Sequence, residues 1–334
     1  MKQQAFEAAH AEGWQAFEVL LDALDQGRGQ HRAVAQELAR SGSDLDPQTL
    51  PMRYRRLCHD LALARERRYS VGLVDRLNRL VLRGHQALYA IRPSGRRRLV
   101  ELLAREFPAR VRAHWRPILL AAVLFWGPTL GVALAVPRFP ELAFLIEDPQ
   151  SLAEAERMYS DAGQKFGRKD QNETDVVMFG FYIWNNVRVD FQAFASGLFL
   201  GLGSLFFLFW NGLHGGAVIG HLVATGHGRN LFSFVVTHSA LEVTALVFAG
   251  AAGLALGWSI LAPGRRSRLH ALRVTAAEVL PLVAGAAVMT ILAAVIEAFW
   301  SSSAVLPHAL KFAVGGTLWA AVAAYFCFAG RRRA

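Results

Sequence analysis

Cysteine and charged residues are both scarce in this chain of 334 residues. The two cysteines, Cys58 and Cys327, lie far apart in the sequence, so they form neither a disulfide framework nor a metal-ligand pair. We interpret both as small buried hydrophobic residues. Charged residues make up 19% of the chain and hydrophobic residues 53%, a balance unusual for a soluble enzyme.

Motifs for common enzyme chemistry are also missing. The sequence contains no Gly-x-Ser-x-Gly, no phosphate-cradling loop, no His-Glu-x-x-His and no dinucleotide fingerprint. We therefore predict no catalytic residue, no cofactor and no metal. The first residues, Met-Lys-Gln-Gln, lack an apolar signal core, so we expect no cleaved signal peptide.

The charges that are present are segregated. The formal net charge is +10. Residues 1–116 hold 21 Lys/Arg against 13 Asp/Glu, whereas residues 137–190 hold 6 against 10. Further basic clusters lie at 265–273 and 331–333. No basic stripe interleaved with aromatics and no nucleic-acid module is evident, so the positive-inside rule explains the excess better than a nucleic-acid partner does.

The first 116 residues are expected to stay outside the membrane. Residues 1–94 show apolar residues at helical spacing, beginning with Phe6, Trp14 and Phe17, and predict a cytoplasmic domain of four or five helices. The aromatic stripe is more typical of a core than of a partner groove. Residues 95–116 predict a basic interfacial helix, and the arginines at 96–116 favour contact with anionic lipids.

Long apolar runs predict a transmembrane domain over 117–334, all-α, with the acidic segment 137–190 extracytoplasmic. About 20 apolar residues cross the roughly 30 Å of a bilayer core. The expected spans are 117–136, 191–210, 231–261, 279–299 and 310–329, with Asn211-Gly212 as a turn before a shorter apolar stretch, 213–226.

Charge parity gives the number of crossings. If every basic cluster is cytoplasmic, the stretch 213–226 must cross, which makes about six spans in a polytopic helical bundle. A re-entrant element at 213–226 is the alternative. We therefore expect a multi-pass protein of the bacterial inner membrane with both termini in the cytoplasm.

Seven glycines in the apolar tract are spaced four residues from another glycine. Such spacing lets helix backbones approach closely where lipid gives no hydrophobic drive for association. The contacts are expected within the chain, with a homo-oligomer as the alternative. The candidates for helix packing are Gly197, Gly201, Gly212, Gly216, Gly220, Gly253 and Gly257.

Polar residues at membrane depth form a second candidate set, because a bilayer solvates them poorly. His238 and Glu242 share one helical face. They are interpreted as a buried structural pair, with a proton relay, a cation site or a polar-substrate site as alternatives. A Glu297–Lys311 pair is a further hypothesis from depth alone. Helix capping is the simpler interpretation of Asn185, Asn186 and Asn211; a specific polar contact is the alternative.

These motifs, in this order, resemble the stage II sporulation protein M family of integral membrane proteins. The resemblance covers roughly Phe181 to the C-terminus and depends on three short marks. They are an Asn-Asn-x-Arg start (Asn185, Asn186, Arg188), Asn211-Gly212, and His-x-x-x-Glu (His238, Glu242). Ser239 stands where the family often has glycine, and the minimal family unit lacks the N-terminal helical region. In spore-formers the resemblance implies a membrane scaffold for peptidoglycan-degrading partners.

Two large non-membrane segments and no catalytic set favour a non-enzymatic scaffold for envelope or cell-wall-related proteins. The alternative function is a transporter, channel or lipid-handling protein that uses the buried polar residues. An intramembrane enzyme is a third possibility, whose nucleophile would have to emerge from the fold.

Overall fold

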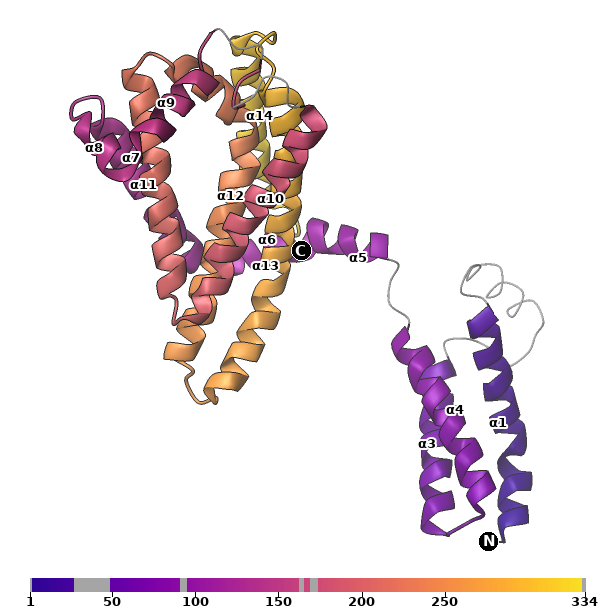
Figure 1. Ribbon diagram of the computed structural model, residues 1–334. Helices are drawn as coiled ribbons and strands as arrows, with labels where there is room; N and C mark the ends of the chain where they lie inside the picture. The colour runs from indigo at the N-terminus through magenta and orange to yellow at the C-terminus, as the bar shows by residue number, and fades with distance from the viewer. Residues whose placement is uncertain (1, 27–48, 91–94, 162–164, 169–173, 332–334) are drawn as a thin grey trace. The chain divides into compact units, whose positions relative to one another are not determined.

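The computed structural model describes residues 2–26, 49–90, 95–161, 165–168 and 174–331 (Figure 1). The chain divides into two compact units, Met1–Arg97 and Arg98–Ala334. Among the described residues the regular structure is helical, apart from one isolated antiparallel bridge between Lys165 and Ser303. This confirms the predicted all-α membrane protein with a helical N-terminal region.

The first unit contains three described helices, α1 (Gln3–Gln26), α3 (Leu50–Glu66) and α4 (Val71–Ala90). Residues 27–48, where the sequence predicts further structure, lie outside the described residues. The aromatic stripe lies in the core, with Phe6 and Phe17 each 1% exposed. Trp14 joins them and donates from Nε1 to the buried Asp60 at 2.8 Å. Partnering the indole N–H removes the cost of burying it.

The basic segment 95–116 forms a broken helix. It runs through α5 (Gly95–Glu101), the π-helical turn η3 (Leu102–Glu106) and α6 (Phe107–Ala113). Leu99 and Val100 are exposed, while Phe107 is buried among α12, α13 and α14. The Arg112 guanidinium donates to the Phe326 carbonyl at 2.8 Å. The second half of this segment therefore packs against the helices of the second unit, which we call the membrane unit.

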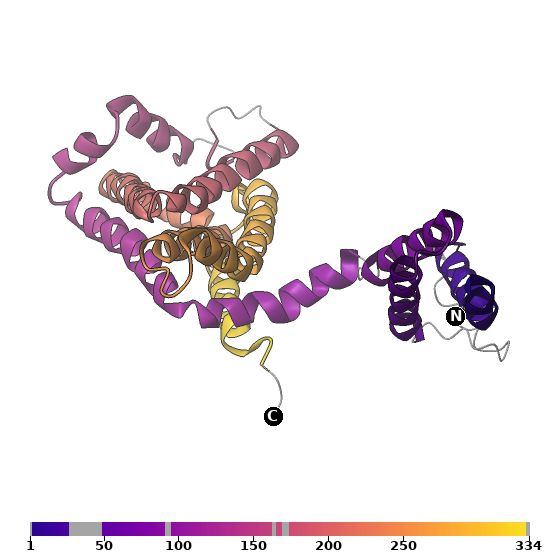
Figure 2. The ribbon, with the colours of Figure 1, turned by 90° about the horizontal axis from the view of Figure 1, so that it is seen from below.

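The second unit has five described helices long and apolar enough to cross a membrane. They are α7 (Trp115–Ala135), α11 (Leu202–Ala224), α12 (Gly228–Leu261), α13 (Arg268–Ile296) continued by the π-helical η5 (Glu297–Ser301), and α14 (His308–Phe328). Figure 2 looks along these helices. The helix α12 contacts α7, α10, α11, α13 and α14, and is the most buried of the five.

The helix α10 (Asp175–Ala195) lies among the five and is 21 residues long. It contacts α11, α12 and α13. Polar residues such as Asn186 and Asp190 lower its hydropathy, yet its length matches the span α7. It therefore packs inside the bundle beside the five apolar helices.

The predicted break at Asn211-Gly212 is wrong. The chain turns earlier, through the short 3₁₀ helix η4 (Ser196–Leu198), and α11 then continues without interruption through Asn211 and Gly212. Leu200 and Gly201 have φ angles of 56° and 84°, which make the reversal. Within this helix the Asn211 side chain is satisfied locally, because its Nδ2 donates to the Phe207 carbonyl at 2.7 Å. The stretch 213–226 is therefore not a separate short span.

Two short helices, α8 (Glu141–Ile146) and α9 (Pro149–Met158), lie over one end of the bundle. Asp148 caps α9 by accepting from the Gln150 amide at 3.0 Å. His221 on α11 contacts Glu156 on α9 at 2.7 Å. We name this the cap end, and the end with the α12–α13 turn at Arg266 the basic end.

The cysteine interpretation needs one correction. Cys327 is exposed on α14 and Cys58 is half-buried, so neither is the buried small hydrophobe expected from the sequence. Cys327 lies on an outward face of α14, where an apolar side chain can contact lipid instead of a protein core.

Candidate cation site

Glycine contacts bring α10, η4 and α11 close to α12 near the basic end. A Cβ atom added at Gly197 would collide with the Gly253 backbone, and one at Gly257 with the Gly201 backbone. The Ser204 hydroxyl, also buried here, donates to the Ala193 carbonyl at 2.6 Å. No side chain fits at these glycine contacts, so the backbones touch directly on this side of the polar interior.

A second glycine seam joins α11 to α7. A Cβ atom at Gly216 would lie 2.7 Å from the Thr129 carbonyl oxygen, and one at Gly220 would lie 2.7 Å from Val136 Cβ. Gly212 makes a similar approach to the Phe125 carbonyl. All seven predicted packing glycines thus contact other segments of the same chain.

The Asn-Asn-x-Arg stretch on α10 presents two different faces. Asn186 is 8% exposed and donates from Nδ2 to Glu297 Oε2 at 3.4 Å. Asn185 donates to Asn186 Oδ1 at 3.0 Å. Arg188 contacts Asn185 and lies 4.6 Å from the centre of the Trp184 ring. Asn186 therefore belongs to the bundle interior, and Arg188 lies on the exposed surface.

His238 and Glu242 lie one turn apart on α12, with His238 Nε2 3.9 Å from Glu242 Oε2. The other ring nitrogen, Nδ1, is 3.0 Å from the Ser301 hydroxyl. The Glu242 Oε2 oxygen is buried and has no hydrogen-bond partner, although 29% of the side chain remains exposed. One oxygen of Glu242 therefore faces the interior, where it can accept a proton or bind a cation.

Glu297 on η5 completes a three-residue cluster. One ligand atom each from His238, Glu242 and Glu297 lies within 4.8 Å of the others. Glu297 is 7% exposed. Sequence reasoning missed this convergence because 55 residues separate Glu297 from Glu242, and no local spacing reports a contact between two helices.

The hypothetical Glu297–Lys311 pair is replaced by other partners. Lys311 is fully buried and donates from Nζ to the carbonyls of Ser301, at 2.8 Å, and Ser303. Ser301 is the last residue of η5 and Ser303 lies just beyond it, where unpaired carbonyl acceptors attract a cation. Lys311 therefore fixes the backbone at the cap end and leaves Glu297 to Asn186.

Asp190 is a further interior carboxylate that sequence reasoning missed. It lies one turn beyond Asn186 on α10 and accepts from the Thr290 hydroxyl on α13 at 2.5 Å. A small cavity of about 100 Å³ adjoins Asp190, and its other lining residues are apolar. Its spacing from Asn186 was a usable signal, because residues four apart share a helical face.

An apolar cluster and an ion pair cover the site at the cap end. Tyr159 packs edge-on against Phe234, with their ring centroids 5.7 Å apart. Phe234 packs in turn against His238, with ring centroids 4.9 Å apart. Burial, then the charges of Glu297 and Glu242, raise the pKa of Tyr159. Nearby, Asp175 pairs with Lys165 and Arg168, and these side-chain hydrogen bonds lower its pKa.

The interior therefore holds three carboxylates and one histidine, arranged along the bundle between the cap and the glycine contacts. None of the three carboxylates has a Lys or Arg partner among the described residues. A low-dielectric interior disfavours unpaired ionised groups, so such groups take up protons or hold a cation. His238, Glu242 and Glu297 offer the mixed nitrogen and oxygen ligands of a divalent-cation site.

Comparisons with known proteins match two parts of the chain. The family model for stage II sporulation protein M matches residues 118–302, and a Domain of unknown function (DUF8413) matches residues 4–90. No curated protein and no solved structure matches the chain. The first match spans more than half of the chain and contains the glycine contacts and the carboxylate cluster. The protein is therefore a multi-pass membrane protein that belongs to the stage II sporulation protein M family.

Proposed function

We propose that the membrane unit is a non-enzymatic, cation-coupled transport protein, and that His238, Glu242 and Glu297 bind the coupling cation. The family is not a known enzyme family. The observation that carries the proposal is the buried Glu242 Oε2 atom, which lacks a hydrogen-bond partner beside two other ligand side chains. A divalent cation or a proton neutralises this oxygen.

The surrounding contacts support binding by these three side chains. The Ser301 contact occupies Nδ1 of His238, which leaves Nε2 facing Glu242. Asn186 holds Glu297 in the same way. Metal-binding side chains are commonly oriented by such neighbours, which fix the histidine tautomer and the carboxylate direction.

The arrangement also suggests alternating access. The Glu242 side chain is partly exposed, and the contacts of Gly197 and Gly201 with α12 hold the helices together on the basic side of the cluster. A transporter binds its coupling ion near the middle of the bilayer and opens one side at a time. Glu242 lies 14 residues from the start of the 34-residue α12, close to its midpoint.

The test uses the full-length protein, purified and reconstituted in liposomes. Zn²⁺ and Mn²⁺ binding is measured by calorimetry, and Zn²⁺, Mn²⁺ and proton entry by fluorescent indicators inside the liposomes. Glu242→Gln and Glu297→Gln should each abolish both binding and entry. Glu278→Gln is the matched control, because Glu278 is an exposed carboxylate on α13 outside the cluster. Wild-type protein that neither binds a cation nor admits one contradicts the proposal.

A scaffold is the second candidate, favoured by helical segments outside the spans. The first unit has its own apolar core, and α8 and α9 form a separate structured segment. In this role the first unit binds cytoplasmic partners, and the cap binds envelope proteins. Crosslinking in native membranes should then trap defined proteins through residues 49–90 and through 141–158. The absence of such products at both segments argues against the scaffold.

Both roles require an orientation. We propose that the protein lies in the bacterial inner membrane with the basic end and both termini in the cytoplasm. The support is the positive charge at 265–273 and the five helices apolar enough to cross, to which we add α10 as a sixth crossing. In intact cells, a cysteine placed at Ser303 should react with a membrane-impermeant maleimide, and one placed at Ser267 should not. The reverse labelling pattern contradicts this orientation.

A further inference from the structure

A cavity of the membrane unit lies at the basic end, and none of its lining residues belongs to the carboxylate cluster. Its volume is about 820 Å³, within the roughly 300–1,000 Å³ of typical ligand pockets. The start of α7, the turn before α11, the end of α12 and the start of α13 line it. Three stretches of the chain, distant in sequence, thus form one pocket.

The lining is mainly apolar and contains no acidic residue. Leu120, Leu202, Leu205 and Leu254 contribute alkyl surface, and Trp258 lies over it with 67% of its surface exposed. Leu200, also in the lining, has a left-handed backbone that leucine rarely adopts. The turn before α11 thus holds an apolar side chain at the pocket in spite of its conformational cost.

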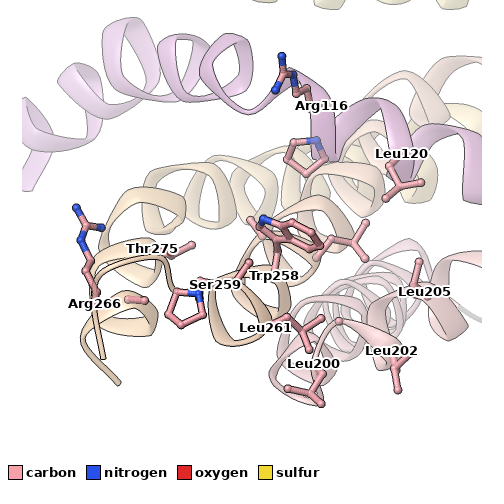
Figure 3. A pocket seen from close by; sticks show the side chains of 17 residues that line it. Arg116, Leu120, Leu200, Leu202, Leu205, Trp258, Ser259, Leu261, Arg266 and Thr275 are labelled. Atoms are coloured by element: carbon pink, nitrogen blue, oxygen red, sulfur yellow. The ribbon is translucent and has the colours of Figure 1, made fainter. Parts of the chain in front are cut away.

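Two arginines give the pocket its charge. Arg116 and Arg266 lie at separate edges, and Trp258 lies near the middle of the lining (Figure 3). Arg116 contacts the Trp115 ring at 5.3 Å, and neither arginine forms an ion pair with an acidic side chain in the described part of the chain. Unpaired guanidinium groups beside alkyl surface suit a molecule with a phosphate and a hydrocarbon chain.

We propose that this pocket binds one anionic phospholipid, with an acyl chain against the leucines and its phosphate held by Arg116 or Arg266. The position supports a lipid, because Trp115 and Trp258 mark the depth at which tryptophan meets lipid headgroups. Basic pockets between transmembrane helices bind anionic headgroups in this way. The site is separate from the cation cluster and needs no cation transport to operate.

The experiment measures lipid selectivity of the full-length protein in nanodiscs. Spin-labelled phosphatidylglycerol and phosphatidylcholine are compared at equal concentration, and the ratio of their association constants is the readout. The double variant Arg116→Gln/Arg266→Gln should lose the preference for phosphatidylglycerol, by about fivefold for each arginine if each supplies about 1 kcal/mol.

The matched control is Arg265→Gln/Arg273→Gln. It removes the same two charges from the same end, and both residues are exposed and outside the lining. Its selectivity should remain near that of the wild type. Equal losses in both double variants, or a wild-type protein without preference, overturn the proposal. Melting temperatures in phosphatidylcholine identify a variant that fails to fold.

A second variant separates a lipid from a free phosphate. Ala255 is half-buried in the lining, so Ala255→Phe fills part of the apolar space without changing charge. It should lower the retention of phosphatidylglycerol severalfold. Unchanged retention, or full displacement of the lipid by millimolar inorganic phosphate, means that the pocket holds only an anionic group and overturns the lipid assignment.

Discussion

The two halves of α12 show how one membrane helix uses opposite kinds of contact. Toward the basic end, Gly253 and Gly257 bring its backbone against the chain at Gly197 and Gly201. Toward the cap end, His238 and Glu242 face an interior of carboxylates, asparagine and serine. The first half is held by close backbone packing. The second half keeps polar groups that a dry bundle tolerates poorly, so the difference separates a packing seam from a candidate site.

The largest effect is expected from Gly253→Ala. The added methyl group would lie 2.6 Å from the Phe194 carbonyl oxygen and 2.7 Å from that of Ala193, so backbone must move. We expect a loss of about 3 kcal/mol in the free energy of unfolding, measured by denaturation in detergent micelles. Gly215→Ala is the control, since nothing lies within 4 Å of its added carbon. A control that loses as much stability would contradict the seam.

A smaller loss is expected from Asp175→Asn at the cap end. Arg168 has a side chain only 1% exposed, so the substitution removes one carboxylate partner from a buried guanidinium. We expect a loss of about 1–3 kcal/mol in the free energy of unfolding. Lys165→Met should cost less, because the Lys165 side chain is 34% exposed. Equal costs would show that the buried arginine does not set the stability of the cap.

The same residue predicts a pH dependence. Lys165 and Arg168 lower the pKa of Asp175 in the folded protein. Its contribution is therefore complete above the unfolded pKa of about 3.9 and is lost as pH falls through the folded value. The stability difference between wild type and Asp175→Asn should stay constant from neutral pH to about pH 5 and shrink below about pH 4. Thermal melts across this range check it, and a constant difference at the lowest pH would refute the linkage.

Glu242→Gln should change stability in the opposite direction. In a metal-chelating buffer above neutral pH, where the Glu242 carboxylate ionises, the substitution removes a charge from an oxygen that has no hydrogen-bond partner. We expect a gain of about 1 kcal/mol, seen as a rise of about 2–4 °C in the melting temperature. Glu278→Gln, on the exposed face of α13, should leave it unchanged. A fall in the melting temperature on Glu242→Gln would mean that the carboxylate stabilises the bundle even without a bound cation.

The smallest effect is expected from Asn211→Ala. Its side chain bonds only within its own helix, to the Phe207 carbonyl, and joins neither the glycine seams nor the carboxylate cluster. Stability should change by less than about 0.5 kcal/mol in detergent denaturation. A large loss would show that Asn211 contributes to the bundle in a way that its intrahelical hydrogen bond does not explain.

Several site residues were recognisable from local spacing. His238 and Glu242 are four residues apart and therefore share a helical face, and each glycine pair has the same spacing. Glu297 and Asp190 were not linked to them, because their contacts cross between helices far apart in sequence. The turn at Ser196–Leu198 was missed for a different reason. The residues from 196 to 201 are mostly apolar. Local backbone hydrogen bonds such as Gly201 N to Gly197 O pair the polar backbone groups of the turn, so no polar side chain marks it in the sequence.

The sequence by itself determined the fold class, because long apolar runs must become membrane helices whose backbone groups pair internally. It also determined which residues could pack closely or resist burial, since glycine spacing and polar residues at depth are local properties. Only the tertiary structure decided that α10 lies inside the bundle, that Glu297 meets His238 and Glu242, and that Lys311 binds carbonyls instead. The physical reason is that contacts between helices depend on rotation and depth, which no single hydrophobic pattern specifies.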